Sequence, residues 1–177
     1  MELNPHLISQ ATEKDINEIA ELVNSAYRGE SSRLGWTTEA DLVGGLRTTP
    51  SELRELIAHP QKALLCLRED THGPILGSVL LERVDEVTFY LGMLAVNPRL
   101  QAQGIGKILI REAEAFARTR DAQQMRLSVL HRRHTLMAWY ERRGYRRNGV
   151  EKPFGLAEAQ DKNLRLVYFE KCLEKAS

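Results

Sequence analysis

The sequence has 177 residues, a usual size for one domain and enough to bury a continuous core without disulfides or a metal. Lysine and arginine together number 25 and aspartate and glutamate 24, so no global charge would concentrate a nucleic acid or an anionic membrane. Apolar residues make up 42% and nowhere form a run of about 18, so we expect one globular domain over residues 1–177 and no membrane span.

The cysteines and the N-terminus indicate a cellular compartment. Cys66 and Cys172 stand far apart and match no metal-ligand spacing, so we expect no metal site. The N-terminal residues do not combine a basic region with an apolar stretch, as a secretory signal would. A reduced, cytoplasmic compartment is therefore expected.

The first part of the chain predicts a strand and then a helix. Residues 7–10 form a short β-rich run, and Thr12 is a suitable N-cap with Asp15 at the third helical position. Apolar residues then recur at helical spacing until Gly29. Residues 28–36 have no period, which favours an exposed loop.

A second helical region is expected after this loop. Helical signals return at 38–42 and again from Thr49, where the cap, Pro50 and Glu52 stand in the order of a capping box. The pair His59-Pro60 ends the region.

Three β-rich runs follow and predict an antiparallel meander over 63–67, 75–81 and 88–96. Asn97-Pro98 ends it, because proline cannot donate to a ladder.

The last part of the chain predicts two helices and two strands. An amphipathic helix begins at Ile105, a strand covers 125–130, and a short helix covers 135–143 with Gly144 just past its end. Residues 164–169 favour a closing strand.

Residues 94–107 carry the strongest chemical signal, because a strand, a turn and a glycine-containing loop lead directly into a helix. Gly104 and Gly106 let backbone N–H groups approach an anion, and the helix adds the positive end of its dipole. A diphosphate is the expected guest.

Other phosphate motifs do not fit this stretch. A Walker loop needs a hydroxyl residue after Gly106-Lys107, where Ile108 stands. A dinucleotide fingerprint needs a third glycine where Leu109 stands, and a βαβ unit where the sequence predicts a meander. The plain alternative is a glycine-rich turn that only starts a helix.

The pattern Gln101-x-x-Gly104-x-Gly106 resembles the acyl-CoA pyrophosphate loop of the GCN5-related N-acetyltransferases, the GNAT family. Residues 139–145, Trp-Tyr-Glu-Arg-Arg-Gly-Tyr, resemble that family's second signature, and the element order is similar over nearly the whole chain. The resemblance implies an α/β (α+β) acyltransferase fold, in which helices flank a mixed, mostly antiparallel central sheet.

The resemblance also implies where acetyl-CoA binds. CoA would lie between the strands 90–96 and 125–130, and its pantetheine would pair with the backbone of Leu94, Ala95 and Val96. Arg99 or Lys107 would add charge near the phosphates. The pyrophosphate would be held by backbone N–H groups of Gln101, Ala102, Gln103, Gly104, Ile105, Gly106 and Lys107.

In this family the amine commonly attacks the thioester directly, and Tyr140 matches the tyrosine that protonates the departing thiolate. A bulge expected near residues 92–94 would present a backbone N–H to the carbonyl. Arg133 stands where many relatives have asparagine.

The general base stays open. Glu82 is the first candidate, His131 and His134 are alternatives, and ordered water is another route for the proton.

For the acceptor, the resemblance indicates the region between the first two helices. Tyr27 and Trp36 would supply aromatic surface, and Glu30, Glu39 or Asp41 would attract an ammonium group, which suggests a cationic amine. Residues 153–155 could line the same mouth.

The sequence therefore predicts an N-acetyltransferase that moves an acetyl or other short acyl group from CoA to a primary amine, on a small molecule or a peptide, in a ternary complex. The alternative is a catalytically weak, CoA-binding regulatory module of the same fold. Neither nucleic acid nor membrane is an expected partner, and a homodimer is left open.

Overall fold

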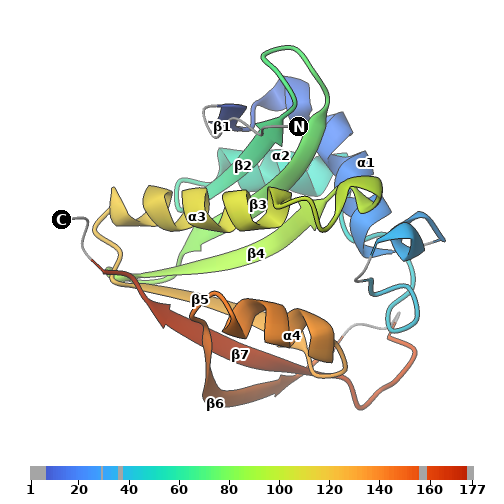
Figure 1. Cartoon of the computed structure of the whole chain (residues 1–177), viewed down its shortest axis with the longest axis vertical. Helices are drawn as coiled ribbons and strands as arrows, with labels where there is room; N and C mark the ends of the chain where they lie inside the picture. The colour runs from blue at the N-terminus through green and yellow to red at the C-terminus, as the bar shows by residue number, and fades with distance from the viewer. Residues whose placement is uncertain (1–6, 29, 36–37, 156–158, 175–177) are drawn as a thin grey trace.

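The computed structural model describes residues 7–28, 30–35, 38–155 and 159–174. Figure 1 shows a twisted sheet with helices on both of its faces. The α-helices and strands, in chain order, are β1 (Ile8–Gln10), α1 (Ile16–Tyr27), α2 (Pro50–Ala58), β2 (Lys62–Arg68), β3 (Ile75–Arg83), β4 (Thr88–Val96), α3 (Ile105–Arg118), β5 (Gln124–Leu130), α4 (His134–Glu141), β6 (Arg146–Pro153) and β7 (Arg165–Cys172).

The strands form a seven-stranded sheet in the order β1-β2-β3-β4-β5-β7-β6. β4 and β5 run parallel, and the other neighbouring pairs are antiparallel. The predicted mixed, mostly antiparallel sheet flanked by helices is confirmed.

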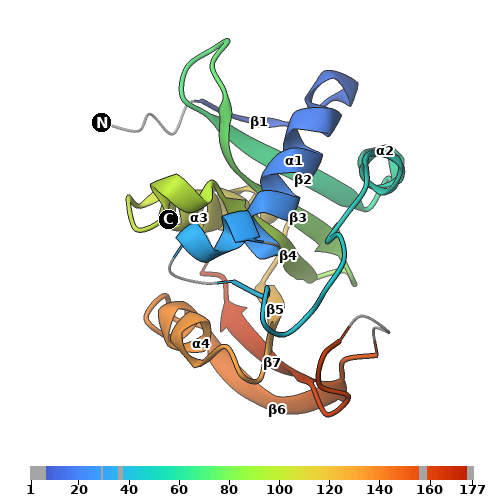
Figure 2. The ribbon, with the colours of Figure 1, turned by 90° about the vertical axis from the view of Figure 1, so that its right-hand side faces the viewer.

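The helices form a layer on each face of the sheet. α3 and α4 lie on the face toward the viewer in Figure 1, whereas α1 and α2 lie behind it, and Figure 2 shows the same two layers from the side. One core cluster joins the apolar stripe of α3 to β3, β4 and β5, and a second joins α1 and α2 to the opposite face. The strongly amphipathic pattern from Ile105 to Ala117 thus forms the seam between α3 and the sheet.

Two segments differ from the sequence prediction. Residues 38–42 form a single turn instead of a helix. The N–H groups of Leu42 and Val43 both donate to the carbonyl of Glu39, and the turn does not continue because Val43 bridges to Ala159. β6 was not predicted. It is an edge strand with mostly exposed side chains, so no buried face imposes an apolar alternation on its sequence.

No helix among residues 7–28, 30–35, 38–155 and 159–174 combines the length and the apolar composition that a bilayer crossing requires.

The contact between β3 and α3 predicts a large effect of one methyl group. A Cβ at Gly77 would lie 2.7 Å from Leu109 Cδ1 and 2.9 Å from the carbonyl oxygen of Ala95, a backbone atom that cannot move alone. Gly77→Ala should therefore lower the free energy of unfolding by about 1–3 kcal/mol in urea titrations.

Gly155→Ala is the matched control, because a Cβ at Gly155 meets no atom within 4 Å. If both variants unfolded at the same urea concentration as the parent, close packing of α3 on β3 would be contradicted.

Candidate functional site

The site begins where β4 and β5 separate. Their parallel ladder has the pairs Thr88↔Gln124, Phe89↔Met125 and Tyr90↔Arg126. β5 then continues along β7 up to Leu130, while β4 continues along β3 up to Val96. The two halves of the sheet diverge from this point (Figure 1), and the edge of β4 after Tyr90 is left without a ladder partner on its β5 side.

A bulge in β4 turns side chains toward this gap. Leu80 pairs with Gly92 and Ser78 with Ala95, so two residues of β4, Met93 and Leu94, face a single residue of β3. Met93 has a φ of 42°. The bulge expected at 92–94 is therefore present.

The bulge also changes which face of the sheet the following side chains of β4 point to. Leu91 belongs to the core under α3, whereas Met93 and Ala95 belong to the core under α1. Leu94 and Val96 pack on the α3 side again, where both line a cavity. Without the extra residue, strict alternation would turn them to the opposite face.

The loop from β4 to α3 is shaped by two residues with positive φ, Ala102 at 66° and Gly104 at 87°. The first helical hydrogen bond runs from Ile108 N to Gly104 O at 3.0 Å. The N–H groups of residues 105–107 precede it, and such groups at the start of a helix have no partner within the helix.

Glycine has a different purpose at each of the two loop positions. A Cβ at Gly104 would meet no atom within 4 Å, so its positive φ accounts for glycine there and the space beside it is open. At Gly106 a Cβ would lie 3.3 Å from the indole of Trp139, so the close approach of α4 accounts for glycine.

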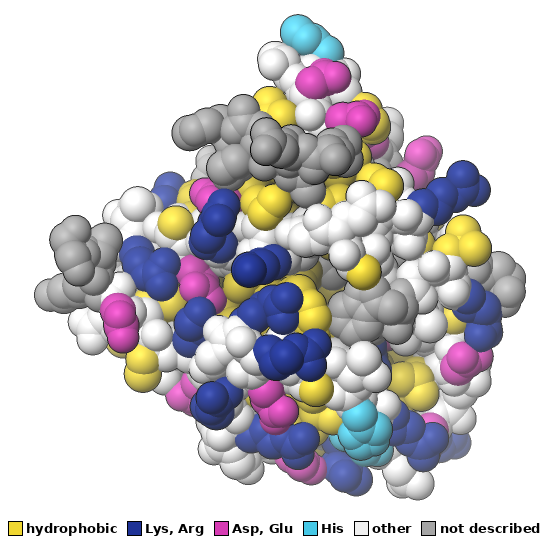
Figure 3. Space-filling view, in the orientation of Figure 1, with side chains coloured by type: hydrophobic (Ala, Val, Ile, Leu, Met, Phe, Trp, Pro, Cys, Tyr) yellow, Lys and Arg dark blue, Asp and Glu magenta, His cyan; other side chains and the backbone are white. Residues whose placement is uncertain are grey.

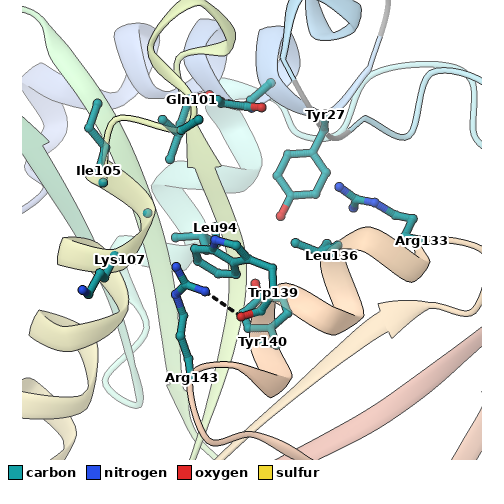
Figure 4. A pocket seen from close by; sticks show the side chains of 15 residues that line it. Tyr27, Leu94, Gln101, Ile105, Lys107, Arg133, Leu136, Trp139, Tyr140 and Arg143 are labelled. Carbon is teal, nitrogen blue, oxygen red and sulfur yellow. Dashed lines mark hydrogen bonds between the residues drawn. The ribbon is translucent and has the colours of Figure 1, made fainter.

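This loop opens into a cavity of about 250 Å³ between α3, α4 and the edge of β4 (Figure 4). Of the predicted cofactor-binding residues, all but Ala95 and Gln103 line it. Ala95 is only 1% exposed and points into the core. Gln101 donates to the carbonyl of Val96 at 3.4 Å, which ties the loop to the end of β4.

Cationic side chains stand around the mouth of this cavity. Lys107, Arg133 and Arg143 line it, and the Arg143 guanidinium stacks 3.6 Å from the centre of the Trp139 ring and donates to the Trp139 carbonyl at 2.7 Å (Figure 4). Lysine and arginine side chains gather in the middle of this face, between α3 and α4, in Figure 3. An anion entering here meets positive charge and free N–H groups together.

A second cavity of about 890 Å³ lies beyond the first, between α1, α2 and the opened strands. The residues common to both linings are Tyr27, Leu94, Arg133, Leu136 and Tyr140. Two guests, one in each cavity, would therefore meet at these side chains.

Tyr140 stands at this meeting point and is only 5% exposed. Its ring packs edge-on against Trp139 and Tyr145, with centroids 5.1 and 5.8 Å away. Burial raises the pKa of the Tyr140 phenol far above its usual value. The group therefore keeps its proton at neutral pH, and its O–H can donate a hydrogen bond.

The larger cavity contains a buried ion network. The Glu39 carboxylate accepts a hydrogen bond from Arg133 at 3.0 Å and pairs with Arg28 Nε at 3.5 Å, and all three side chains are at most 10% exposed. Arg133, a departure from the resembled family, thus connects α4 to the segment after α1. Two cations already balance Glu39, so its charge is not available to attract a substrate ammonium.

The other candidates for the acceptor side lie as follows. Tyr27 and residues 153–155 line the larger cavity. Asp41 is exposed and pairs with Arg33 at 2.7 Å. The predicted residue Trp36 and the side chain of Glu30 lie outside the described part of the structure.

The three candidates for the general base do not line either cavity that holds Tyr140. Glu82 pairs with Lys62 at 3.7 Å and lines a separate hollow at the closed end of the gap, next to Tyr90. His131 accepts from the Arg165 N–H at 3.0 Å, and His134 is exposed at the start of α4.

The sequence did not single out several polar residues in the lining of the larger cavity, among them Arg47 and Tyr90, and it included Arg28 only within the range 27–36. Arg28 and Arg47 belong to irregular stretches without a period, and Tyr90 is one of many β-formers in its strand. A local signal to find them was absent, since only the fold brings them together.

Comparison with known proteins agrees with this geometry. A family model described as "Acetyltransferase (GNAT) family" matches residues 16–145. No curated protein sequence matches the chain.

Solved structures with the same fold include three acetyltransferases. The ribosomal-protein-S18-alanine N-acetyltransferase of Escherichia coli is 14% identical, with 96% of this chain and 95% of that chain covered and a TM-score of 0.71. An IAA acetyltransferase of Bacillus cereus is 14% identical over 94% and 98%, with a TM-score of 0.66. An acetyltransferase of GNAT family from Staphylococcus aureus is 14% identical over 94% and 98%, with a TM-score of 0.66. At these identities the likeness concerns the fold alone.

The ion network predicts that Glu39 is structural. Glu39→Gln would leave Arg28 and Arg133 facing each other without a buried counter-charge, which should lower the free energy of unfolding by about 3 kcal/mol in urea titrations. Asp41→Asn is the matched control, since it removes a carboxylate of the same segment from an exposed pair. Equal stability of Glu39→Gln and the parent would show that the network contributes nothing.

Proposed function

The chain belongs to the acetyltransferase (GNAT) family, and from this premise we propose that it transfers an acetyl or other short acyl group from acyl-CoA to a primary amine. The observation that carries the proposal is that two cavities meet at Tyr140. The smaller of the two starts at the N–H groups at the beginning of α3. An enzyme that joins two substrates needs such an arrangement, with one binding space for each and a proton donor between them.

The chemistry of the smaller cavity fits the diphosphate of CoA. Backbone N–H groups at the start of α3, the open space beside Gly104 and the positive charge of Lys107 and Arg143 all favour a doubly charged anion. These features support the assignment of residues 101–107 to the pyrophosphate. When bound, the cosubstrate supplies the thioester whose carbonyl carbon is attacked.

The edge of β4 fits the pantetheine part. After Tyr90 this edge is without a ladder partner toward β5, so the backbone from Leu94 to Val96 can hydrogen-bond an extended amide-containing chain as a further strand would. The bulge at Met93 and Leu94 adds an N–H outside the regular ladder, which can polarise a carbonyl nearby.

In the proposed reaction the neutral amine nitrogen forms a bond to the thioester carbonyl carbon and the carbon–sulfur bond breaks. Tyr140 gives its phenolic proton to the departing sulfur, so that the thiol and the amide are the products. The amine releases one proton. Glu82, His131 and His134 do not line the cavities, so we propose that water accepts this proton in place of these three groups. Solvent then returns a proton to Tyr140, which balances the cycle.

The proposed pyrophosphate loop can be tested by a pair of variants of equal size. Gly104→Asp would direct a carboxylate toward the diphosphate, and Gly104→Asn would place a neutral amide in the same open space with the same backbone strain. Calorimetric titration with acetyl-CoA should give a dissociation constant roughly 10- to 100-fold weaker for Asp than for Asn. Equal affinities would contradict the assignment of the loop.

The role of Tyr140 is tested by Tyr140→Phe, which keeps the ring and its packing but removes the proton donor. In a thiol-release assay over a panel of amines, kcat should fall about 100-fold, while affinity for acetyl-CoA stays the same. An unchanged kcat would remove Tyr140 from the chemistry. If the parent protein binds acetyl-CoA but releases no thiol with any amine, the alternative of a regulatory CoA-binding module is supported instead.

A further inference from the structure

The acceptor end of the larger cavity has a positive charge that the proposed chemistry does not use. Arg28, Arg47 and Arg133 line it together with Glu39, around the Tyr27 ring that both cavities share. Arg47 and Arg133 approach this ring to 5.4 and 5.8 Å from its centroid. Around this ring stand three guanidinium groups and the Glu39 carboxylate, while the carboxylates of Glu52 and Glu55 line the part of the cavity formed by α2.

Two of these arginines already have defined partners. Arg28 pairs with Glu39 and donates to the carbonyls of Gly44 and Leu46 at 3.2 and 2.9 Å. Arg133 pairs with Glu39 at 3.0 Å. Arg47 differs from both, because within the described residues its guanidinium forms no ion pair, and it lies over the Tyr27 ring.

The backbone of Arg47 is nevertheless held firmly. Asn24 on α1 accepts hydrogen bonds from the N–H groups of Arg47 and Thr48 at 2.7 and 3.2 Å and donates to the Thr48 carbonyl at 2.9 Å. Arg28 holds the preceding carbonyl of Leu46. One side chain of α1 and that of Arg28, directly after α1, therefore fix the start of the Arg47 side chain relative to the site, as a preorganised binding group requires.

The other charged groups of this cavity form no ion pair with Arg47 within the described residues. The Glu52 carboxylate accepts from Thr48 Oγ1 and the Thr49 N–H, and caps α2. Lys62 pairs with Glu82. Glu55 is exposed on α2 and does not line the smaller cavity.

A guanidinium in this position favours a carboxylate and repels a second cation. Its planar N–H groups match the two oxygens of a carboxylate, and the half-buried site strengthens the charged hydrogen bonds. On the basis of the proposed acyl transfer, we infer that the acceptor is an amine that carries a carboxylate, such as an α-amino acid, and that Arg47 binds this carboxylate. This replaces the cationic amine that the acidic residues of the sequence suggested.

The test compares acceptors that differ only in this charge. Thiol release from acetyl-CoA is measured with the twenty standard amino acids, with their C-terminal amides and with putrescine as a dication. The parent protein should have a higher kcat/KM for an amino acid than for its amide, and putrescine should be a poor acceptor. In Arg47→Gln the ratio of kcat/KM for acid over amide should fall roughly 10- to 100-fold, the usual effect of one charged hydrogen bond.

Arg54→Gln is the matched control, because it makes the same change in net charge at an exposed residue of α2 that lines neither cavity. It should leave the ratio unchanged. A preference for amides or for putrescine, or an unchanged ratio in Arg47→Gln, would overturn the inference.

A second readout separates this inference from the proposed function. In the presence of CoA, the protein is titrated calorimetrically with N-acetylleucine and with N-acetylleucinamide, which need no turnover to bind. The anion site is supported if the parent binds N-acetylleucine more tightly than N-acetylleucinamide and if Arg47→Gln abolishes this difference. This result would support the site even if no acyl transfer is found. Equal binding of the two, or binding of neither, overturns the anion site even if acyl transfer to other amines is found.

Discussion

The separation of β4 from β5 is the constraint on which the rest of the structure depends. β5 pairs with β7 along its whole length, and β4 pairs with β3 through a bulge, so the two strands share only three ladder pairs. Backbone hydrogen-bonding groups in a sheet normally find partners in the next strand. Beyond Tyr90, the backbone groups of β4 on its β5 side face a gap, and a ligand can take the place of the missing strand.

Both cavities follow from this gap. The bulge at Met93 returns Leu94 and Val96 to the α3 side, and the chain leaves β4 directly into the start of α3. The smaller cavity therefore combines a strand edge with a helix N-terminus, and the larger one opens on the other side of Tyr140. The burial of Tyr140 between Trp139 and Tyr145 keeps its proton in place, since a buried phenolate would lack the solvation of water.

The sequence predicted those features whose causes are local. The amphipathic period of α3, the glycine-containing loop that leads into it and the capping box at Thr49 are each encoded within a few residues, and all are present. β6 could not be predicted, because an exposed edge strand needs no apolar pattern. The surroundings of Glu39 could not be predicted either, since its partner Arg133 is 94 residues away and only the fold makes them neighbours. The sequence indicates a Glu39 carboxylate that is available to attract an ammonium group, whereas in the structure it is buried and paired with two arginines.

The most direct test of the account is a two-dimensional amide NMR spectrum of the isotope-labelled protein, recorded as acetyl-CoA is added. If N–H groups at the start of α3 and the open edge of β4 hold the cosubstrate, the largest shifts should fall on residues 101–107 and 94–96. The amides of β1 and of the β6 edge should hardly change. The account would be contradicted if saturating acetyl-CoA left the amide signals of residues 101–107 and 94–96 unshifted, or if it shifted the signals of other segments more strongly.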